Sequence, residues 1–395
     1  MSVTAAAGFV AGGLACGIKA SGDPDLAVVA TTSGAPVPAA AVFTSNLMTA
    51  APVLACRDHL LATGGHAAAV VLNSGNANAA TGRSGRADAE RMCALTARYL
   101  GCATEAVLVC STGLIGIPLP MASIEAGIAS LAGGLTGALG ADEAAGAAAA
   151  EALRTTDTHR KEVVVSGDGF VVGGMAKGAA MLAPKMATML AVLTTDAAAP
   201  PDALRRALRA GVAESFNVLT VDGATSTNDT VILLASGLGG PPAGGQGALV
   251  DAVVAACGEL AAQMAGDAEG ATKVVRLRVS GAASDDDAKA AARKVAQSQL
   301  VKCSWYGQDP YWGRIASELG SSGAAFDPDK LRIAYGGTDV CREGVAVDHD
   351  AAALRAHMAG RQLVIDADLG LGQGSASVLT NDLTHAYVDE NMGTS

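Results

Sequence analysis

The sequence has few aromatic residues and no clustered positive charge. Only 3% of its residues are Phe, Trp or Tyr although 50% are hydrophobic, so alanine, valine and leucine have to build the core. Its 27 basic and 38 acidic residues give a net charge of −11 and form no dense Lys/Arg segment. Binding to nucleic acid or to an anionic lipid surface needs such a segment. We therefore expect neither kind of partner.

The chain also lacks long apolar runs without interruption. The stretches 107–124 and 231–250 are very apolar, but both contain Gly and Pro, unlike a membrane-spanning helix. No charged segment followed by an apolar one opens the sequence, so no secretion signal is predicted. We expect a soluble, cytoplasmic protein that does not enter a membrane.

Metal-binding and disulfide patterns are missing as well. The eight cysteines are scattered without a Cys-x-x-Cys pair, which in a chain of 395 residues predicts reduced, mostly buried thiols. The six histidines show no i, i+4 pairing, so no metal site is expected. The glycine-rich GLGQG from Gly370 lacks the spacing of a nucleotide-binding loop and is predicted to be an ordinary loop.

What the sequence does contain is a mixed order of strands and helices. The stretch 161–178 is predicted to be a hairpin, because two β-branched runs flank the turn signal Ser166–Gly169. The glycine-rich stretch 237–247 is predicted to be a loop. Further elements are expected as a strand and loop at 66–82, a half-buried strand at 272–281, and helices at 86–100, 201–216 and 284–300. This order predicts an α+β fold, with a domain boundary near Ser284.

Hydroxyl side chains gather at several predicted strand ends. They lie at Ser111–Gly113, Thr155–Thr158, Ala187–Thr188 and Thr225–Thr230. For any one of these segments a turn or a helix cap is the ordinary interpretation. Composition and periodicity alone therefore indicate an α+β protein, most readily an enzyme, without a defined reaction.

One segment identifies a family. GGMAKGAAMLAPKMATMLAVLTTDA, residues 173–197, resembles the signature of the ornithine acetyltransferase family, whose bifunctional members are also called glutamate N-acetyltransferase/amino-acid acetyltransferase. Other segments resemble the family in the same order over nearly the whole chain: VVLNSGNANAATG, STGLIG, TTDTHRKE, SFNVLTVDGATSTNDT, EGATK, LVKCSWYGQDPYWGRI and DLTHAYVDEN. The resemblance implies an αββα-type sandwich similar to self-cleaving N-terminal-nucleophile aminopeptidases at 1–283, and a smaller C-terminal α/β domain at 284–395.

The resemblance also implies that the chain cuts itself. Family members break the bond between Ala and Thr of the Met-Ala-Thr-Met signature, here Ala187–Thr188, which would leave an α chain of residues 1–187 and a β chain of residues 188–395. A threonine hydroxyl needs a base to act as a nucleophile. An α-amino group has a pKa of about 7.7–8.0, against about 10.4 for lysine, so cleavage supplies a base close to neutral pH.

The reaction implied is a ping-pong transfer without a cofactor. N2-acetyl-L-ornithine would acetylate Thr188 and leave as L-ornithine, and L-glutamate would then take the acetyl group within cyclic arginine biosynthesis. Thr112 and Gly113 match the oxyanion hole of the family. Positions that match substrate-binding residues are Thr155, Lys177, Thr188, Glu269, Asn391 and Ser395. The resemblance also allows acetyl-CoA as a co-substrate and an α2β2 heterotetramer as the assembly.

Several alternatives stay open at this point. The chain could be a self-processing aminopeptidase or amidase of related fold, an acetyltransferase of specialised metabolism, or an uncleaved binding protein. Lys177 could stand at an exposed hairpin end, and Glu269 at a solvated helix terminus. The sequence departs from the family at Lys185 and Tyr311, where Asn is usual. Its shortened end leaves Thr394 as well as Ser395 for the terminal contact.

Overall fold

The computed structural model describes residues 2–133, 137–182 and 189–392 of the chain. Their contacts divide the chain into two compact units. The first unit comprises Met1–Asn217 and Ala224–Met264, and the second comprises Val218–Gly223 and Ala265–Ser395. Each unit has a β-sheet core of its own and is described by itself.

Two sheets form the centre of the first unit. The described residues form a four-stranded sheet in the order β1-β2-β5-β6 and a six-stranded sheet in the order β4-β3-β11-β9-β8-β7. Neighbouring strands run antiparallel except for the parallel pairs β5–β6 and β11–β9. The strands are β1 (Phe9–Leu14), β2 (Leu26–Thr31), β3 (Val37–Phe43), β4 (His66–Ala67), β5 (Ala69–Asn76), β6 (Val107–Leu114), β7 (Lys161–Ser166), β8 (Val171–Lys177), β9 (Leu190–Ala197) and β11 (Thr230–Gly240).

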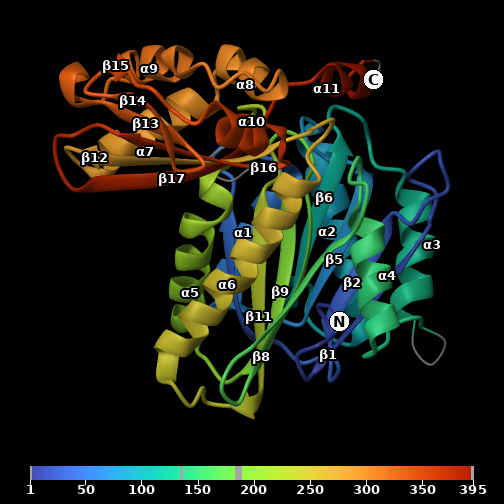
Figure 1. The fold of residues 1–395 in the computed structure, drawn as a ribbon. Coiled ribbons are helices and arrows are strands. Elements are labelled where there is room, and N and C mark those ends of the chain that lie inside the picture. The colour runs from blue at the N-terminus through green and yellow to red at the C-terminus, as the bar shows by residue number, and fades with distance from the viewer. Residues whose placement is uncertain (1, 134–136, 183–188, 393–395) are drawn as a thin grey trace. The chain divides into compact units, whose positions relative to one another are not determined.

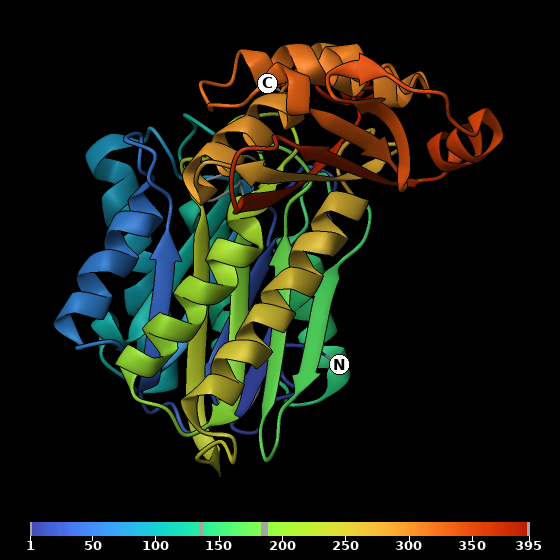
Figure 2. The ribbon, with the colours of Figure 1, turned by 60° about the vertical axis from the view of Figure 1, so that its left-hand side comes forward.

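Helices cover the outer faces of both sheets. Figures 1 and 2 show α5 and α6 side by side over the six-stranded sheet, and α2 and α3 pack on the four-stranded sheet. In addition, α1 contacts β6, and α4 contacts β1 and β2. The helices are α1 (Ala51–Ala62), α2 (Gly82–Leu100), α3 (Met121–Ala132), α4 (Glu143–Leu153), α5 (Pro201–Glu214) and α6 (Gly245–Gly266), with short 3₁₀ turns at Thr104–Ala106 and Phe216–Val218. The predicted α+β sandwich is confirmed.

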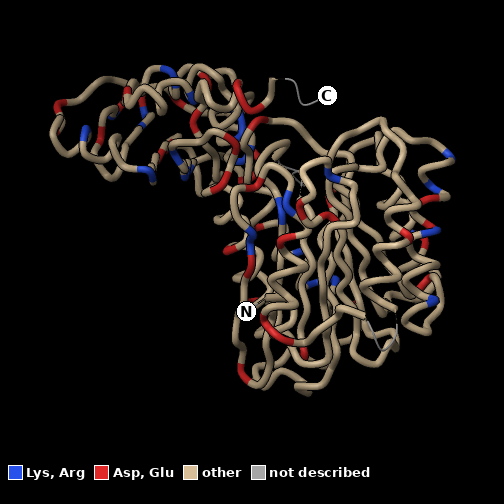
Figure 3. Tube along the Cα trace, turned by 90° about the vertical axis from the view of Figure 1, so that its right-hand side faces the viewer, with Lys and Arg blue, Asp and Glu red and all other residues tan. Residues whose placement is uncertain are grey.

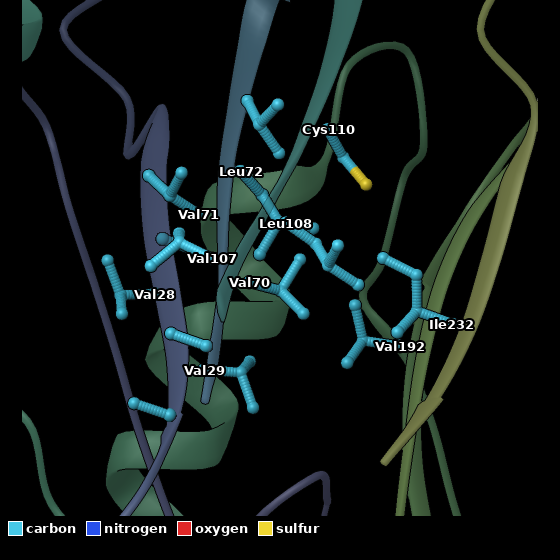
Figure 4. Packing of buried hydrophobic residues seen from close by; sticks show 14 of the residues in the cluster. Val28, Val29, Val70, Val71, Leu72, Val107, Leu108, Cys110, Val192 and Ile232 are labelled. Atoms are coloured by element: carbon cyan, nitrogen blue, oxygen red, sulfur yellow. The ribbon is translucent and has the colours of Figure 1, made fainter. Parts of the chain in front are cut away.

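The core of the first unit lies between its two sheets. Val28, Val70 and Leu108 from the four-stranded sheet belong to one buried cluster with Val192 and Ile232 from the six-stranded sheet (Figure 4). Small and β-branched side chains dominate this cluster, as the scarcity of aromatic residues requires. Of the eight cysteines, all free thiols, five are buried.

Local signals account for most of the elements. The hairpin β7–β8 forms where the turn signal predicts it, with Ser166 paired to Val171. Helix α2 ends at Gly101, which has a φ of 73° and closes the helix in the left-handed conformation. The loop predicted at 237–247 is partly wrong, because β11 continues to Gly240, which pairs with Ala197 of β9, and α6 begins at Gly245.

The second unit is built on one mixed sheet. Its described strands lie in the order β10-β17-β12-β16-β13-β14-β15. They are β10 (Leu219–Thr220), β12 (Val274–Ala282), β13 (Arg332–Tyr335), β14 (Thr338–Arg342), β15 (Val345–Ala346), β16 (Gln362–Asp368) and β17 (Gly374–Asn381). Along β12, Val275, Leu277 and Val279 are buried while Arg276 and Arg278 are exposed, as the alternating pattern predicts.

Helices of the second unit pack on this sheet around Trp305 and Tyr335. Helix α7 contacts β12 and β17, and the Ser284 hydroxyl caps its first turn by accepting a hydrogen bond from the N–H of Asp287. The helices are α7 (Asp285–Ala296), α8 (Gln299–Tyr306), α9 (Trp312–Gly320), α10 (Ala351–Ala359) and α11 (His385–Glu390), with a 3₁₀ turn at Pro328–Lys330. The division by contacts places β12 in this unit, together with Val218–Gly223 and the rest of Ala265–Ser395, whereas the sequence predicts a boundary near Ser284.

Candidate active site

Three strand ends of the six-stranded sheet meet beside the predicted nucleophile. Lys177, the last residue of β8, pairs with Leu190, the first residue of β9, and Leu190 pairs with Thr230, the first residue of β11. Met189 directly precedes β9 and its N–H donates a hydrogen bond of 3.1 Å to Oδ1 of Asp229. Ala187 and Thr188 lie outside the described residues, so Met189 marks the point at which the chain leaves Thr188.

The predicted oxyanion residues lie in the last part of β6, where its pairing with β5 becomes irregular. Gly113 has a φ of 131°, and a Cβ built there would come within 2.2 Å of the Gly75 carbonyl carbon. Only glycine fits this conformation and this close approach to β5. Thr112 is buried, and no described residue forms a hydrogen bond with its hydroxyl. The end of β6 therefore keeps a hydroxyl and an exposed backbone position, Gly113, close together.

A buried asparagine joins the end of β6 to the strand end next to Met189. Asn228 Nδ2 donates hydrogen bonds to the carbonyl oxygens of Ser111 (2.9 Å) and Ala77 (2.6 Å). Ser111 precedes Thr112, and Asp229, which binds Met189, follows Asn228. The Asn228–Asp229 dipeptide thus connects the end of β6, which holds the predicted oxyanion residues, to the residue that follows the predicted nucleophile. Sequence reasoning missed this role, because the segment 225–230 was interpreted as a turn; its run of polar residues before a buried strand was the available signal.

A second set of predicted residues gathers around Asp157. One of its oxygens accepts hydrogen bonds from Lys161 Nζ (2.6 Å) and the Gly178 N–H (2.7 Å), and the other accepts from the N–H of Thr155 (3.1 Å). Burial raises the pKa of Asp157, but the cations of Lys177 and Lys161 and these hydrogen bonds outweigh it and hold the pKa well below the ordinary value. Lys177 is 4% exposed, which excludes the exposed hairpin end considered from the sequence.

Asp229 shows the opposite electrostatic behaviour. It is fully buried, and burial raises its pKa well above the ordinary value for a carboxyl. The Met189 N–H, the Ser226 and Thr44 hydroxyls and the Lys177 cation favour its ionised form but do not compensate for burial. Two buried carboxylates near one lysine therefore differ in charge state: Asp157 is firmly ionised, while Asp229 binds a proton readily.

The remaining predicted residues lie in the second unit. Asn391 Nδ2 donates a hydrogen bond of 2.8 Å to Oε2 of Glu269. Glu269 is 8% exposed, so it is not a solvated helix terminus. It lines a cavity of about 180 Å³ together with Val221, Asp222, Gln297, Gln299, Lys302, Asp382, Leu383 and Tyr387. Ser395 and Thr394 lie outside the described residues.

The cavity of the second unit combines acidic groups with one buried lysine. Burial lowers the pKa of Lys302 to about 8, although Asp382 and Asp222 favour its charged form. Burial, with the charges of Asp222 and Glu269, raises the pKa of Tyr387 to about 12. Such a lining suits a small ligand that carries an ammonium group. Lys302 and Asp382 were not predicted from the sequence, since each side chain reaches the cavity only through the tertiary fold.

The structure thus groups the predicted residues into three sets. In the first set, Asn228 joins Thr112 and Gly113 to the neighbourhood of Met189. In the second set, Thr155 and Lys177 both interact with Asp157. In the third set, Glu269 is hydrogen-bonded to Asn391. Among the described residues no cluster of three or more His, Cys, Asp and Glu side chains could hold a metal ion. Basic and acidic residues are scattered along the traced chain among uncharged ones (Figure 3).

Comparison with known proteins connects this site to a family. The sequence profile of the ArgJ family matches residues 10–393. The chain belongs to the ArgJ family. An ArgJ relative from Streptomyces avermitilis, the arginine biosynthesis bifunctional protein ArgJ, is 48% identical over 392 residues, which cover 99% of both chains. The protein of the same name from Mycobacterium tuberculosis H37Rv is also 48% identical, over 98% of this chain and 95% of its own.

A solved ArgJ-family structure is also similar. The crystal structure of an ornithine acetyltransferase from Mycobacterium tuberculosis, in complex with ornithine, is 41% identical to this chain. The match covers 46% of this chain and 94% of that chain, with a TM-score of 0.41. The family assignment itself follows from the profile and from the full-length relatives.

Helix α6 is the one described helix that is long and apolar enough to cross a membrane. Half of its most apolar window is buried inside the protein, as in the core helix of many folded domains. Leu249, Val253 and Leu260 are among its buried side chains.

Proposed function

We propose that this ArgJ-family chain is an N-acetyltransferase of arginine biosynthesis that acts through an acetyl-Thr188 intermediate. It transfers the acetyl group of N2-acetyl-L-ornithine to L-glutamate and needs no cofactor. The observation that carries the proposal is the bridge made by Asn228 and Asp229, which connects the end of β6, beside Thr112, to the N–H of Met189. The full-length relatives, proteins named for arginine biosynthesis, support the same pathway.

The proposed maturation is an N-to-O acyl shift at residue 187. The Thr188 hydroxyl attacks the carbonyl carbon of Ala187, the peptide C–N bond breaks, and the α-amino group of Thr188 takes a proton. Water then hydrolyses the ester, which leaves residues 1–187 and 188–395 as separate chains. With a pKa of about 7.7–8.0, roughly one such amine in ten is unprotonated at pH 7 and can act as a base.

The end of β6 supports the oxyanion role. Gly113 is exposed and Thr112 has a hydroxyl without a partner among the described residues, so both suit the binding of the negative oxygen of a tetrahedral intermediate. One such donor contributes about 2.7–4 kcal/mol to catalysis in a comparable enzyme. In the proposed cycle this site is used twice, once when ornithine leaves and once when glutamate attacks.

Charged residues supply the proposed substrate contacts. Lys177 and Thr155, which share Asp157, suit an α-carboxylate, and Glu269 with Asn391 suits an ammonium group. Ser395 completes the substrate-binding set by resemblance. An α2β2 assembly, a cytoplasmic location and the use of acetyl-CoA as a second donor belong to the same proposal.

Intact mass spectrometry with an acceptor assay tests this function. The wild-type protein is measured before and after brief exposure to N2-acetyl-L-ornithine, and ornithine release is followed with and without glutamate. We expect a 188–395 chain that gains one acetyl group, and turnover that depends on glutamate. Equal ornithine release without glutamate would instead identify a hydrolase. A Thr188→Ala variant should remain one inactive chain of 38.8 kDa.

A further inference from the structure

A polar cavity of about 150 Å³ lies in the first unit beside Thr155, one of the residues that match substrate-binding positions of the family. It is formed by the loop that joins β1 to β2 and by the end of α4 with the residues that follow it. Every residue that lines it is polar or charged: Lys19, Ser21, Asp23, Glu151, Arg154 and Thr155. Such a lining suits a small ligand that itself carries charged groups.

Lys19 is the cation of this cavity that forms no ion pair with a described residue. Its Nζ donates one hydrogen bond, of 2.7 Å, to the carbonyl oxygen of Pro24. An ammonium group has three donors, so two of them stay without a partner among the described residues. Arg154, in contrast, is paired with Glu151 and donates to the carbonyl oxygen of Asp157 at 2.9 Å. A ligand anion would therefore find its strongest free donor in Lys19.

The carboxylate of Asp25 fixes the backbone at Lys19 but does not neutralise its side chain. It is buried and accepts four backbone N–H groups, from residues 16–19, at 2.6–3.1 Å. Burial raises the pKa of Asp25, but these hydrogen bonds outweigh it and lower the pKa. Burial also lowers the pKa of Lys19, although the charges of Asp25 and Asp23 favour its ammonium form. A bound anion would offset this burial.

The same lysine lies beside the strand that faces the predicted oxyanion residues. A Cβ built at Gly75, in the last part of β5, would lie 3.1 Å from Cγ of Lys19, so the lysine stem packs on the Gly75 backbone. Gly75 is paired with Gly113 of β6. The Ser74 hydroxyl donates to the carbonyl oxygen of Ala152 at 2.6 Å and so ties β5 to the end of α4. The cavity therefore adjoins the oxyanion residues within one unit.

We propose that Lys19 binds the α-carboxylate of the amino-acid substrates in the cavity beside Thr155. This inference rests on the proposed function and adds a binding residue to it. N2-acetyl-L-ornithine and L-glutamate both carry this carboxylate, on the same carbon as the reacting nitrogen. It has to stay close to the oxyanion residues during transfer, as Lys19 does. The side-chain ammonium of ornithine and the side-chain carboxylate of glutamate lie farther from the reacting nitrogen.

Other polar groups of the cavity fit the rest of an amino-acid head group. The Thr155 hydroxyl lies 3.4 Å from an oxygen of Asp157, a long hydrogen bond that it can exchange for one to a substrate carboxylate. Asp23 accepts the Ser21 hydroxyl at 2.8 Å and retains acceptor sites for the ammonium group of incoming glutamate. The cavity thus offers a donor and an acceptor for the two charges of one amino acid.

Lys19→Met and Lys19→Arg test the proposal, with Lys294→Met as the control. Methionine removes the ammonium group but keeps an unbranched stem that can pack on Gly75, whereas arginine restores a cation. Lys294 belongs to α7 in the second unit, and its Nζ forms an ion pair of 3.4 Å with Glu318. Its methionine variant reports the effect of losing one positive charge elsewhere.

All variants are compared with wild type for self-cleavage on a denaturing gel, for thermal unfolding, and for kcat and KM with each substrate. Lys19→Met should be cut normally and should raise KM for N2-acetyl-L-ornithine and L-glutamate alike, by about 10- to 100-fold, the range of one charge-assisted hydrogen bond. Lys19→Arg should recover most of this loss, and Lys294→Met should keep the wild-type KM. An unchanged KM in Lys19→Met, an increase for only one substrate, or a loss that arginine does not reduce would overturn the proposal.

Modification of the wild-type protein decides the case if Lys19→Met gives no soluble protein. L-ornithine at about ten times its dissociation constant should slow the reaction of Lys19 with a lysine-directed reagent about tenfold, without an effect at Lys294. An equal rate at Lys19 with and without L-ornithine would overturn the inference. Failure of the proposed function is separate, since the wild-type chain itself would then stay uncut or unacetylated.

Discussion

Replacing Gly113 by alanine perturbs the predicted oxyanion residues at the end of β6 most directly. The added Cβ would lie 2.2 Å from the Gly75 carbonyl carbon and 2.4 Å from the Asn76 nitrogen, both of them backbone atoms that cannot rotate away. The φ of 131° is in addition unfavourable for alanine. The end of β6 therefore has to shift away from β5.

The size of the effect follows from the two roles of this residue. Misplacing one oxyanion donor lowers kcat about 10²- to 10³-fold, or about 2.7–4 kcal/mol. The backbone misfit lowers the free energy of unfolding by about 1–3 kcal/mol. We therefore expect a protein that still folds but transfers acetyl groups at least a hundred times more slowly.

Gly116→Ala is the matched control. Gly116 lies two residues beyond the end of β6 and has a φ of 88°, but a Cβ there would meet no atom within 4 Å. This variant should show a smaller loss of stability in thermal unfolding than Gly113→Ala, and near-normal kcat. The reasoning is refuted if Gly113→Ala retains kcat within threefold of wild type, or if both variants lose kcat equally.

Three other substitutions test the remaining structure. Asn228→Ala removes the donor to two buried carbonyl oxygens and should lower the free energy of unfolding by about 2–4 kcal/mol in urea titrations. Self-cleavage, followed on a gel, should also be slower. An unchanged rate of cleavage would contradict the proposed role of the Asn228–Asp229 bridge. The pKa of Asp157 is depressed in the folded state, so its stabilising effect is present above about pH 4 and is lost as pH falls through the folded pKa. Asp157→Asn should therefore unfold at a lower temperature than wild type at pH 7, and the difference between the two unfolding temperatures should become smaller in acid. Burial lowers the pKa of Lys302 to about 8 in the folded protein. The free energy of unfolding of wild type should therefore rise by about 3 kcal/mol between about pH 8 and pH 10.5, whereas that of Lys302→Met should not. Parallel curves of unfolding free energy against pH for the two proteins would contradict this.

Elements that depend on local chemistry were predictable from the sequence. The hairpin β7–β8 has its turn residues at Ser166–Gly169, and α7 begins at a serine cap followed by acidic residues, so neighbouring residues alone determine both. The end of β11 was not predictable in this way. Its glycines, Gly237 to Gly240, are typical of a loop, but pairing with Ala197 of β9 extends the strand.

The same distinction holds within the candidate site. The resemblance located Thr112, Gly113, Lys177 and Glu269, because their segments can be recognised in the linear sequence. It did not show that the charge of Lys177 acts on both Asp157 and Asp229, since these residues come from separate segments. Asn228 was equally hidden, because its importance lies in hydrogen bonds to Ser111 and Ala77, more than 100 residues away in the chain.

The central claim is that a hydroxyl acquires its base when the peptide bond before it is broken. Amino-terminal sequencing of the purified, active protein tests this claim most directly. The account predicts two amino termini in equal amounts, one from the start of the chain and one that begins Thr-Met-Leu-Ala at Thr188. Full acetyl-transfer activity in a protein with a single amino terminus, and with residues 187 and 188 still joined, would contradict it.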